Sequence, residues 1–239
     1  MQVFLIENAK GQSGWLDADE TRHCRKALRH HPGDELHAID GAGTYYRARL
    51  AAYEGDRTRL DLLSQQAEWG EHGGQLCLAF SPLRLRDRFE FLMEKAVELG
   101  VTHLVPLQCA RTDPYKAKYK PTRLHTILRT ALKQCLRSRL PDLAPLTPFA
   151  DWIGQPQLGQ GLIATCEDEP PRQPLAQLLP TLPTPALTLL IGPEGDFTPA
   201  EVQQALAAGY RPISLGTNRL RSETAAVHAL SLVKGAWGF

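Results

Sequence analysis

The sequence predicts an α/β protein in which a small β-rich domain precedes a larger domain with a mainly parallel sheet. Short apolar runs separated by glycine turns dominate the first part of the chain, and apolar strands alternate with helices in the rest. A polar, glycine-bearing stretch at 69–74 separates the two patterns. We therefore expect a small β-barrel over 1–70 and an α/β domain over 74–239.

The barrel is predicted from strand-sized runs and from the turns between them. Gly41 to Gly43 and Gly55-Asp56 are typical hairpin turns, and residues 19–29 have helical spacing. The expected strands are 3–6, 35–40, 45–53 and 57–63.

The second domain is predicted from buried strands and two clear helices. The expected strands are 75–80, 101–107, 162–166, 187–191 and 212–215, and the helices are 87–99 and 121–137. Asp87 and Glu90 have capping-box spacing, and Gly100 follows the first helix. In the second helix we expect a buried stripe of Leu124, Ile127, Leu128, Ala131 and Cys135, with Arg129, Lys133 and Arg137 repeating every four residues on another face.

Composition excludes several classes of protein. The 239 residues carry a net charge of +1, and no apolar run approaches the roughly 20 residues of a membrane span. The N-terminal residues 1–10 lack the pattern of a secretory signal, so we expect a soluble, cytoplasmic protein. The five cysteines form no CxxC pair and the eight histidines form no HExxH pattern, so we expect neither disulfides nor a metal site.

The balanced total charge hides a basic middle segment. Residues 1–70 carry a net charge of −2, residues 71–140 carry +7 and residues 141–239 carry −4. Between 111 and 139, nine Lys and Arg residues accompany one acid, Asp113. Such a block favours a polyanionic partner such as nucleic acid, and the alternative is a merely solvated helix face.

Two segments near the C-terminus carry the chemistry. In the first, residues 189–201, an apolar strand runs into Gly192-Pro-Glu-Gly195, and a helix then begins with Thr198 as N-cap, Pro199 at its first position and Glu201 completing a capping box. Ligands of open α/β sheets bind at the carboxyl ends of strands, where this loop is expected. The alternative is an ordinary strand-to-helix turn.

In the second segment, residues 213–226, another strand ends in Gly216 and leads through a polar loop into an Ala-rich helix. Arg221 and Glu223 lie in the turn before that helix, either as a surface ion pair or as groups that orient a substrate. The sequence has no GxGxxG and no Walker lysine, which disfavours nucleotide hydrolysis and hydride transfer.

Together, GPEG-D-F-T-x-x-E and LG-x-x-x-LR-S-E-T-A resemble the bacterial 16S ribosomal RNA uridine N3-methyltransferases of the SPOUT superfamily. The resemblance extends to 23–34 and to RFEFLMEKAVELGV at 88–101. The chain departs from the family at three places: Asp196 replaces a usual Gly, Asn218-Arg219 replaces an Arg-aliphatic pair, and Lys133 replaces a usual Glu.

The resemblance implies a trefoil-knotted SPOUT domain preceded by a PUA-like barrel that positions RNA. It also implies a homodimer with the active site near the subunit interface, S-adenosyl-L-methionine as cofactor, and 16S rRNA of the small ribosomal subunit as partner. The helix from Glu223, with its small residues, is a candidate dimer contact or plain core packing. The cofactor-binding residues implied are Leu190, Ile191, Gly192, Glu194, Gly195, Leu215, Gly216, Leu220 and Thr224.

For catalysis we expect Arg221 to stabilise a uracil anion and Glu223 either to orient Arg221 or to act as a proton acceptor, with Glu94 as a further candidate. The expected RNA contacts are Arg25, Arg29, Arg88, Arg111, Lys133, Gln134 and Arg137, with the basic loop 111–120. Two alternatives stay open: a SPOUT enzyme that methylates ribose 2′-OH or transfer RNA, and a non-catalytic RNA-binding ribosome-assembly factor.

Overall fold

The computed structural model describes residues 1–113, 121–167, 171–183 and 185–239. They form two compact units, one of residues 1–72 with 128–140 and the other of residues 73–127 with 141–239. The first boundary lies in the polar stretch at 69–74. The assignment of 128–140 to the first unit was not expected from the sequence, which indicated a helix belonging to the α/β domain.

The first unit is a closed barrel with the strand order β1-β2-β5-β4-β3. Its strands are β1 (Val3–Lys10), β2 (Ser13–Leu16), β3 (Glu35–Ile39), β4 (Thr44–Glu54) and β5 (Arg57–Ala67). Neighbours are antiparallel except β1 and β3, whose parallel pairing closes the barrel. Helix α1 (Ala18–Arg22) continues into the π-helical turn η1 (His23–Ala27). Strand β2 was missed because its four residues carry no alternating apolar pattern.

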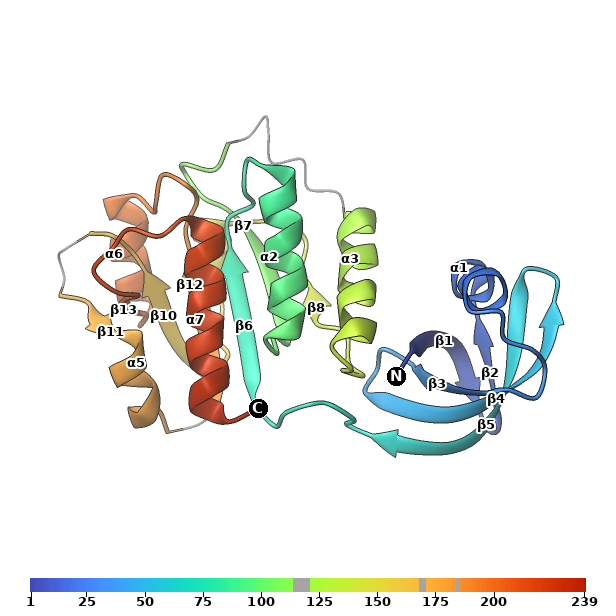
Figure 1. The fold of residues 1–239 in the computed structure, drawn as a ribbon. Helices are drawn as coiled ribbons and strands as arrows, with labels where there is room; N and C mark the ends of the chain where they lie inside the picture. The colour runs from blue at the N-terminus through green and yellow to red at the C-terminus, as the bar shows by residue number, and fades with distance from the viewer. Residues whose placement is uncertain (114–120, 168–170, 184) are drawn as a thin grey trace. The chain divides into compact units, whose positions relative to one another are not determined.

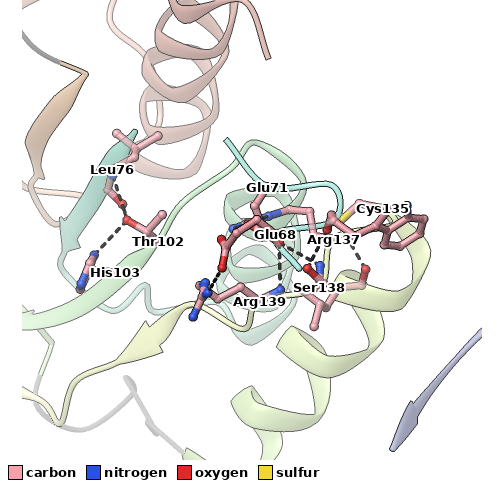
Figure 2. Close-up of polar contacts among 11 residues, drawn as sticks. Glu68, Glu71, Leu76, Thr102, His103, Cys135, Arg137, Ser138 and Arg139 are labelled. Atoms are coloured by element: carbon pink, nitrogen blue, oxygen red, sulfur yellow. Dashed lines mark hydrogen bonds and ion pairs between the residues drawn. The ribbon is translucent and has the colours of Figure 1, made fainter. Parts of the chain in front are cut away.

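Residues that follow the helix 121–134 are tied to the segment after β5 by hydrogen bonds to Glu71, which we call the Glu71 clamp (Figure 2). Both Nε and Nη2 of Arg137 donate to one oxygen of Glu71, at 3.1 and 2.8 Å. The backbone amides of Ser138 and Arg139 donate to the other oxygen, each at 2.8 Å. The side chains of Arg137 and Glu71 are only 6% and 4% exposed, so their ion pair is buried. Both oxygens of the Glu71 carboxylate accept hydrogen bonds.

Gly70 permits the close approach in this clamp. A Cβ at Gly70 would stand 2.1 Å from the carbonyl oxygen of Leu136, and its φ of +71° lies in the left-handed region. Leu136 itself has a φ of +61°, which ends the preceding helix. The helix therefore stops at Gln134, three residues before the predicted end.

The second unit is built on a parallel sheet with the order β11-β13-β10-β12-β6-β7-β8, and β9 pairs with β7 off this path. Its strands are β6 (Gln75–Phe80), β7 (His103–Gln108), β8 (Asp142–Leu143), β9 (Thr147–Pro148), β10 (Gln160–Ala164), β11 (Gln173–Pro174), β12 (Ala186–Ile191) and β13 (Arg211–Ser214). Every strand pairing in it is parallel, as the alternation of strands and helices predicts.

Helices cover the sheet of the second unit. They are α2 (Arg86–Glu98), α3 (Pro121–Gln134, which continues into the first unit), α4 (Phe149–Ile153), α5 (Leu175–Leu178) with the 3₁₀ turn η2 (Leu179–Thr181), α6 (Pro199–Ala207) and α7 (Ser222–Trp237). α2 and α7 lie side by side on one face (Figure 1). α4 and α6 share a core with alternate residues of β6, Cys77 and Ala79, whereas Phe80 of the same strand contacts Phe89 of α2.

The predicted capping box of α2 is wrong. The helix begins at Arg86, its N-cap Leu85 makes no side-chain cap, and Glu90 accepts hydrogen bonds from Arg86 and Arg123 instead. Charge-assisted bonds to two guanidinium groups outweigh a bond to a backbone amide. In the described residues, no helix is long and apolar enough to span a membrane.

Candidate active site

A cavity of about 320 Å³ opens at the carboxyl ends of β10, β12 and β13 in the second unit. These three strands are neighbours in the sheet order, and the carboxyl ends of parallel strands are the usual ligand-binding edge. The cavity is also lined from α2 and from the start of α7. Its lining residues are Arg88, Ala164, Thr165, Cys166, Arg172, Ile191, Gly192, Pro193, Glu194, Asp196, Ile213, Leu215, Gly216, Asn218, Arg219, Leu220, Arg221, Ser222 and Ala225.

The first bend, residues 191–197, is held to the loops that follow β6 and β7. The carboxylate of Glu194 accepts from the backbone amide of Arg84, after β6, at 2.9 Å. Nη1 of Arg111, after β7, donates to the carbonyl oxygens of Gly195 at 2.7 Å and Phe197 at 3.3 Å. These bonds fix the bend from two sides in the absence of a ligand. Less conformational entropy of the bend is therefore lost when a ligand binds.

Helix α6 begins as the sequence predicts. Thr198 is its N-cap, Pro199 is its first residue, and Thr198 and Glu201 form both bonds of a capping box. The other oxygen of Glu201 accepts from the amide of Ala110 at 2.8 Å, so this buried carboxylate also joins the α6 start to the β7 loop. The prediction for this turn is confirmed.

Asp196 links the same bend to the end of β10. Its carboxylate accepts from the amide of Cys166 at 2.7 Å, from the hydroxyl of Thr165 at 3.3 Å and from the amide of Phe197 at 2.8 Å. Its φ of +64° lies in the left-handed region, which a non-glycine residue rarely adopts. Three accepted hydrogen bonds offset that strain.

The second bend, residues 215–221, contributes both apolar and positively charged side chains to the cavity wall. Gly216 has a φ of +122°, a conformation open to glycine, and Leu215 and Leu220 line the cavity on either side of it. Arg221 lines the cavity as the residue before α7. Within the part of the chain that the structure describes, the guanidinium of Arg221 forms no ion pair, so its charge is available to a ligand.

Glu223 lies in the first turn of α7, but its partner is not Arg221. Its Oε1 stands 3.5 Å from Nε of Arg88, which comes from α2 and lines the cavity. The Glu223 side chain is 10% exposed, and its buried Oε2 has no hydrogen-bond partner among the residues that the structure describes. The structure therefore replaces the expected Arg221–Glu223 relation with an Arg88–Glu223 pair. Glu94, the further candidate, is half exposed beside Lys95 and does not line the cavity.

The structure brings most of the expected cofactor-binding residues together at the cavity wall. Those at the wall are Ile191, Gly192, Glu194, Leu215, Gly216 and Leu220. Leu190 belongs instead to the core under α4 and α6, Gly195 packs against Arg111, and Thr224 is exposed on α7. Successive residues of β12 face opposite sides of the sheet, which explains why Leu190 and Ile191 differ.

The expected RNA contacts are scattered. Arg88 lines the cavity, Arg111 holds the first bend, and Arg25 and Arg29 are exposed at the end of η1. Gln134 is exposed at the end of α3. Lys116, Lys118 and Lys120 lie outside the described residues.

The cations at the end of α3 and just after it are paired within the first unit. Arg129 donates to Asp17 at 3.0 Å, and Lys133 pairs with Glu20. Arg137 is buried against Glu71. All three cations thus have carboxylate partners, which a phosphate would have to displace in order to bind them.

Several cavity residues were not predicted as site residues, and three of them, Thr165, Cys166 and Arg172, come from a segment that the sequence analysis did not single out. They follow β10, a strand recognised in the sequence, but the segment carries no glycine bend or motif. The available signal was topological, because β10 ends at the same sheet edge as β12 and β13.

Comparison with known proteins gives the class of this fold and site. The family model described as an RNA methyltransferase domain matches residues 71–234. A solved structure of a probable rRNA-methyltransferase from Porphyromonas gingivalis superposes with a TM-score of 0.86 at 28% identity, covering 100% of this chain and 99% of that one. The chain is an RNA methyltransferase, and the predicted α/β fold class is confirmed.

The particular family follows from two further matches. Ribosomal RNA small subunit methyltransferase E from a Synechocystis species is 30% identical over 220 residues, which are 91% of this chain and 71% of that protein. The same enzyme from Neisseria gonorrhoeae, solved bound to S-adenosyl methionine, superposes with a TM-score of 0.82 at 30% identity over 99% of this chain and 98% of that one. This chain belongs to the family of ribosomal RNA small subunit methyltransferase E.

Proposed function

We propose that the protein transfers a methyl group from S-adenosyl-L-methionine to N3 of a uridine in 16S rRNA of the small ribosomal subunit. The observation that carries the proposal is the cavity at the ends of β10, β12 and β13, where the two glycine-bearing bends meet beside the guanidinium of Arg221. The relatives named for small-subunit rRNA methylation, and the neighbour solved with the cofactor, support the same assignment.

The cavity suits an adenosine-containing ligand. Its size is in the range of small-ligand sites, and apolar side chains such as Ile191, Leu215 and Leu220 line it together with backbone of both bends. A Cβ at Gly192 would press on the buried Phe197, and a Cβ at Gly216 would enter open space at a φ of +122°, so both bends depend on glycine for different reasons. When bound, S-adenosyl-L-methionine supplies an electrophilic methyl group, and the residues of the chain supply the rest.

The uracil N3–H must lose its proton before the nitrogen becomes a good nucleophile. In the proposal, Arg221 stabilises the negative charge that develops on the uracil, because a cation held beside the reacting base favours the charged transition state. Arg88 adds a second guanidinium, and Glu223 is a positioning residue that holds Arg88 through the 3.5 Å contact. N3 is hidden in a Watson–Crick pair, so the target base enters unpaired or flipped out.

The barrel positions the RNA in this proposal. The exposed Arg25 and Arg29 are its candidate phosphate contacts, and their contribution falls as salt rises. Lys133 of α3 and Arg137, which follows α3, are secondary candidates, because their carboxylate partners compete with phosphate.

We also propose that the enzyme works as a homodimer with the active site near the subunit interface. Ala226 and Ala229 of α7 are already buried within the chain, so they do not carry this proposal. Support comes from apolar side chains left exposed at and near α2, Leu85 at 49% and Phe91 at 45%. Light scattering after size exclusion should give twice the 26.5 kDa chain mass, and the single-chain mass would contradict it.

Nucleoside mapping tests the reaction. Small subunits from cells that lack the enzyme are incubated with the protein and labelled cofactor, and the 16S rRNA is digested to nucleosides. We expect 3-methyluridine as the labelled product. A methyl group on ribose O2′, or on transfer RNA instead, would favour a different SPOUT activity, and the absence of both methyl transfer and calorimetric binding of the cofactor would favour a ribosome-assembly factor.

A further inference from the structure

The outer face of the barrel carries aromatic side chains that belong neither to its core nor to the proposed reaction. Along β3 and β4, Leu36, Ala38 and Tyr46 are part of the barrel core, so the residues between them face outward. His37 and Tyr45 lie on this outward face, and both side chains are partly exposed. A ligand can therefore reach them without entering the barrel.

Trp69, from the segment after β5, extends this pair to three rings, which we call the aromatic stack. The ring centroids of Tyr45 and Trp69 are 4.5 Å apart with an interplanar angle of 27°, and those of His37 and Tyr45 are 5.9 Å apart with an angle of 20°. The Tyr45 hydroxyl and Nδ1 of His37 are hydrogen-bonded at 2.6 Å. The rings are thus nearly parallel and held in place, so a flat ligand that packs on them does not have to order them first.

The segment after β5 does not need the aromatic stack to stay in position. The hydroxyl of Ser138 donates to the carbonyl oxygen of Trp69 at 2.6 Å, and the Glu71 clamp holds the residues that follow. None of these hydrogen bonds uses the ring of Trp69. The ring therefore has a part to play beyond fixing its own backbone.

An excess of positive charge lies beside the aromatic stack. In the β3–β4 ladder Arg47 is directly across from His37, and Arg49 is directly across from Glu35. Both guanidinium groups contact the Glu35 carboxylate, Arg47 at 2.7 Å and Arg49 at 3.4 Å. One carboxylate thus faces two cations, whose side chains are 55% and 49% exposed, so positive charge remains for an anionic partner.

We infer that this face of the barrel binds a single-stranded part of the RNA, with an unpaired base packed on the aromatic stack and the neighbouring phosphates beside Arg47 and Arg49. This inference rests on the proposed function, because it names how the barrel holds the rRNA. Proteins that bind single strands combine aromatic rings, on which bases stack, with cations that follow the backbone. A base inside a duplex has both faces covered by its neighbours, so the stack selects unpaired segments.

The test measures binding of a short oligouridylate and the KM for small subunits from cells that lack the enzyme. Trp69→Leu removes the ring, and Trp69→Phe keeps an aromatic face at the same position. Trp15→Leu is the matched control, because Trp15 of β2 belongs to the same barrel but has the Arg57 guanidinium over its ring, 5.5 Å from the centroid. Glu35→Gln and Arg47→Gln change the charge beside the stack.

Trp69→Leu should weaken oligouridylate binding and raise the KM for small subunits by about fivefold or more, whereas Trp69→Phe and Trp15→Leu should stay within about twofold. The kcat at saturating substrate should not change, because no reacting atom is touched. Glu35→Gln should tighten binding and Arg47→Gln should weaken it, more at low salt than at high salt. Oligouridylate should also quench tryptophan fluorescence in the unmodified protein and not in Trp69→Phe.

Unchanged binding and KM in Trp69→Leu would overturn the inference, and so would an equal loss in Trp69→Phe or in Trp15→Leu. These results leave the proposed function standing as long as the unmodified protein still forms 3-methyluridine. Failure to form that product, with the oligouridylate results as expected, would remove the proposed reaction and keep the single-strand site. If thermal unfolding shows that Trp69→Leu does not fold, weaker binding by Glu35→Gln or the absence of quenching would overturn the inference in its place.

Discussion

At the scale of single residues, the proposed mechanism depends on which charged side chains at the cavity wall already pair with another residue of the protein. Arg221 lines the wall without an ion pair among the described residues, whereas Arg88 is 3.5 Å from the buried Glu223. A free guanidinium can respond to charge on a substrate, and a paired one is held in place by its partner. Arg221 and Arg88 therefore have separate parts in the proposed reaction.

Replacing Arg221 should lower turnover far more than cofactor affinity. Arg221→Ala removes charge stabilisation that is needed only as the uracil anion develops, and such losses are on the order of 10²-fold in kcat. Steady-state methylation and calorimetry with S-adenosylhomocysteine measure the two quantities. Equal losses in kcat and affinity would contradict the assigned role, and Lys234→Ala, near the far end of α7, should change neither.

Arg88 and Glu223 should behave as one unit. If Glu223 acts through Arg88, then Arg88→Ala, Glu223→Ala and the double variant should lose similar activity, because residues that work together are not additive. The measurement is kcat and KM for RNA in all four proteins. Independent, additive losses would show that Glu223 has a role of its own.

At the scale of elements, glycine bends and helix caps could be predicted from the sequence. Hydrogen-bond partners that lie far apart in the sequence could not. Thr198 and Glu201 form the predicted capping box because its partners are three residues apart. The predicted capping box of α2 does not form, because Arg123, which is far away in the sequence, donates to the Glu90 carboxylate. The same reason explains Arg137, whose partner Glu71 stands 66 residues away.

The Glu71 clamp should contribute much more stability than its exposed neighbour. Glu71→Ala leaves the buried Arg137 without a counter-charge, which costs about 3–5 kcal/mol of unfolding free energy. Glu68→Ala breaks the exposed pair with Arg139 and should cost about 1 kcal/mol or less. Denaturant unfolding of the full chain measures both, and equal small effects would exclude a buried clamp.

Glu90 should make stability depend on pH in acid. Hydrogen bonds from Arg123 and then Arg86 lower the pKa of Glu90 from 4.5 to about 2. A lowered carboxyl pKa gives stability that is complete above about pH 4.5 and is lost as the pH falls toward 2. Thermal unfolding of Glu90→Gln should therefore vary less over that range than the unmodified protein. An unchanged profile would contradict the pairing, and Glu94→Gln on the same helix is the control.

At the scale of the whole molecule, the sequence predicts that a β-barrel precedes a domain with a parallel sheet. It does not predict which residues belong to each of the two units. Periodicity predicts strands and helices, so the barrel and the parallel sheet follow. The strand order that brings β10 beside β12 and β13 is not local information, and Thr165, Cys166 and Arg172 were missed for that reason. The helix 121–134 was predicted, but which unit its end joins depends on Glu71 and Gly70.

The central claim is that the bends 191–197 and 215–221 together hold the methyl donor beside Arg221. A crystal structure of the protein with S-adenosylhomocysteine tests this most directly. We predict the adenosine between Ile191–Glu194 and Leu215–Leu220, with the sulfur directed toward the open cavity that Arg221 lines. Ligand density bound elsewhere, with both bends uncontacted, would contradict the account.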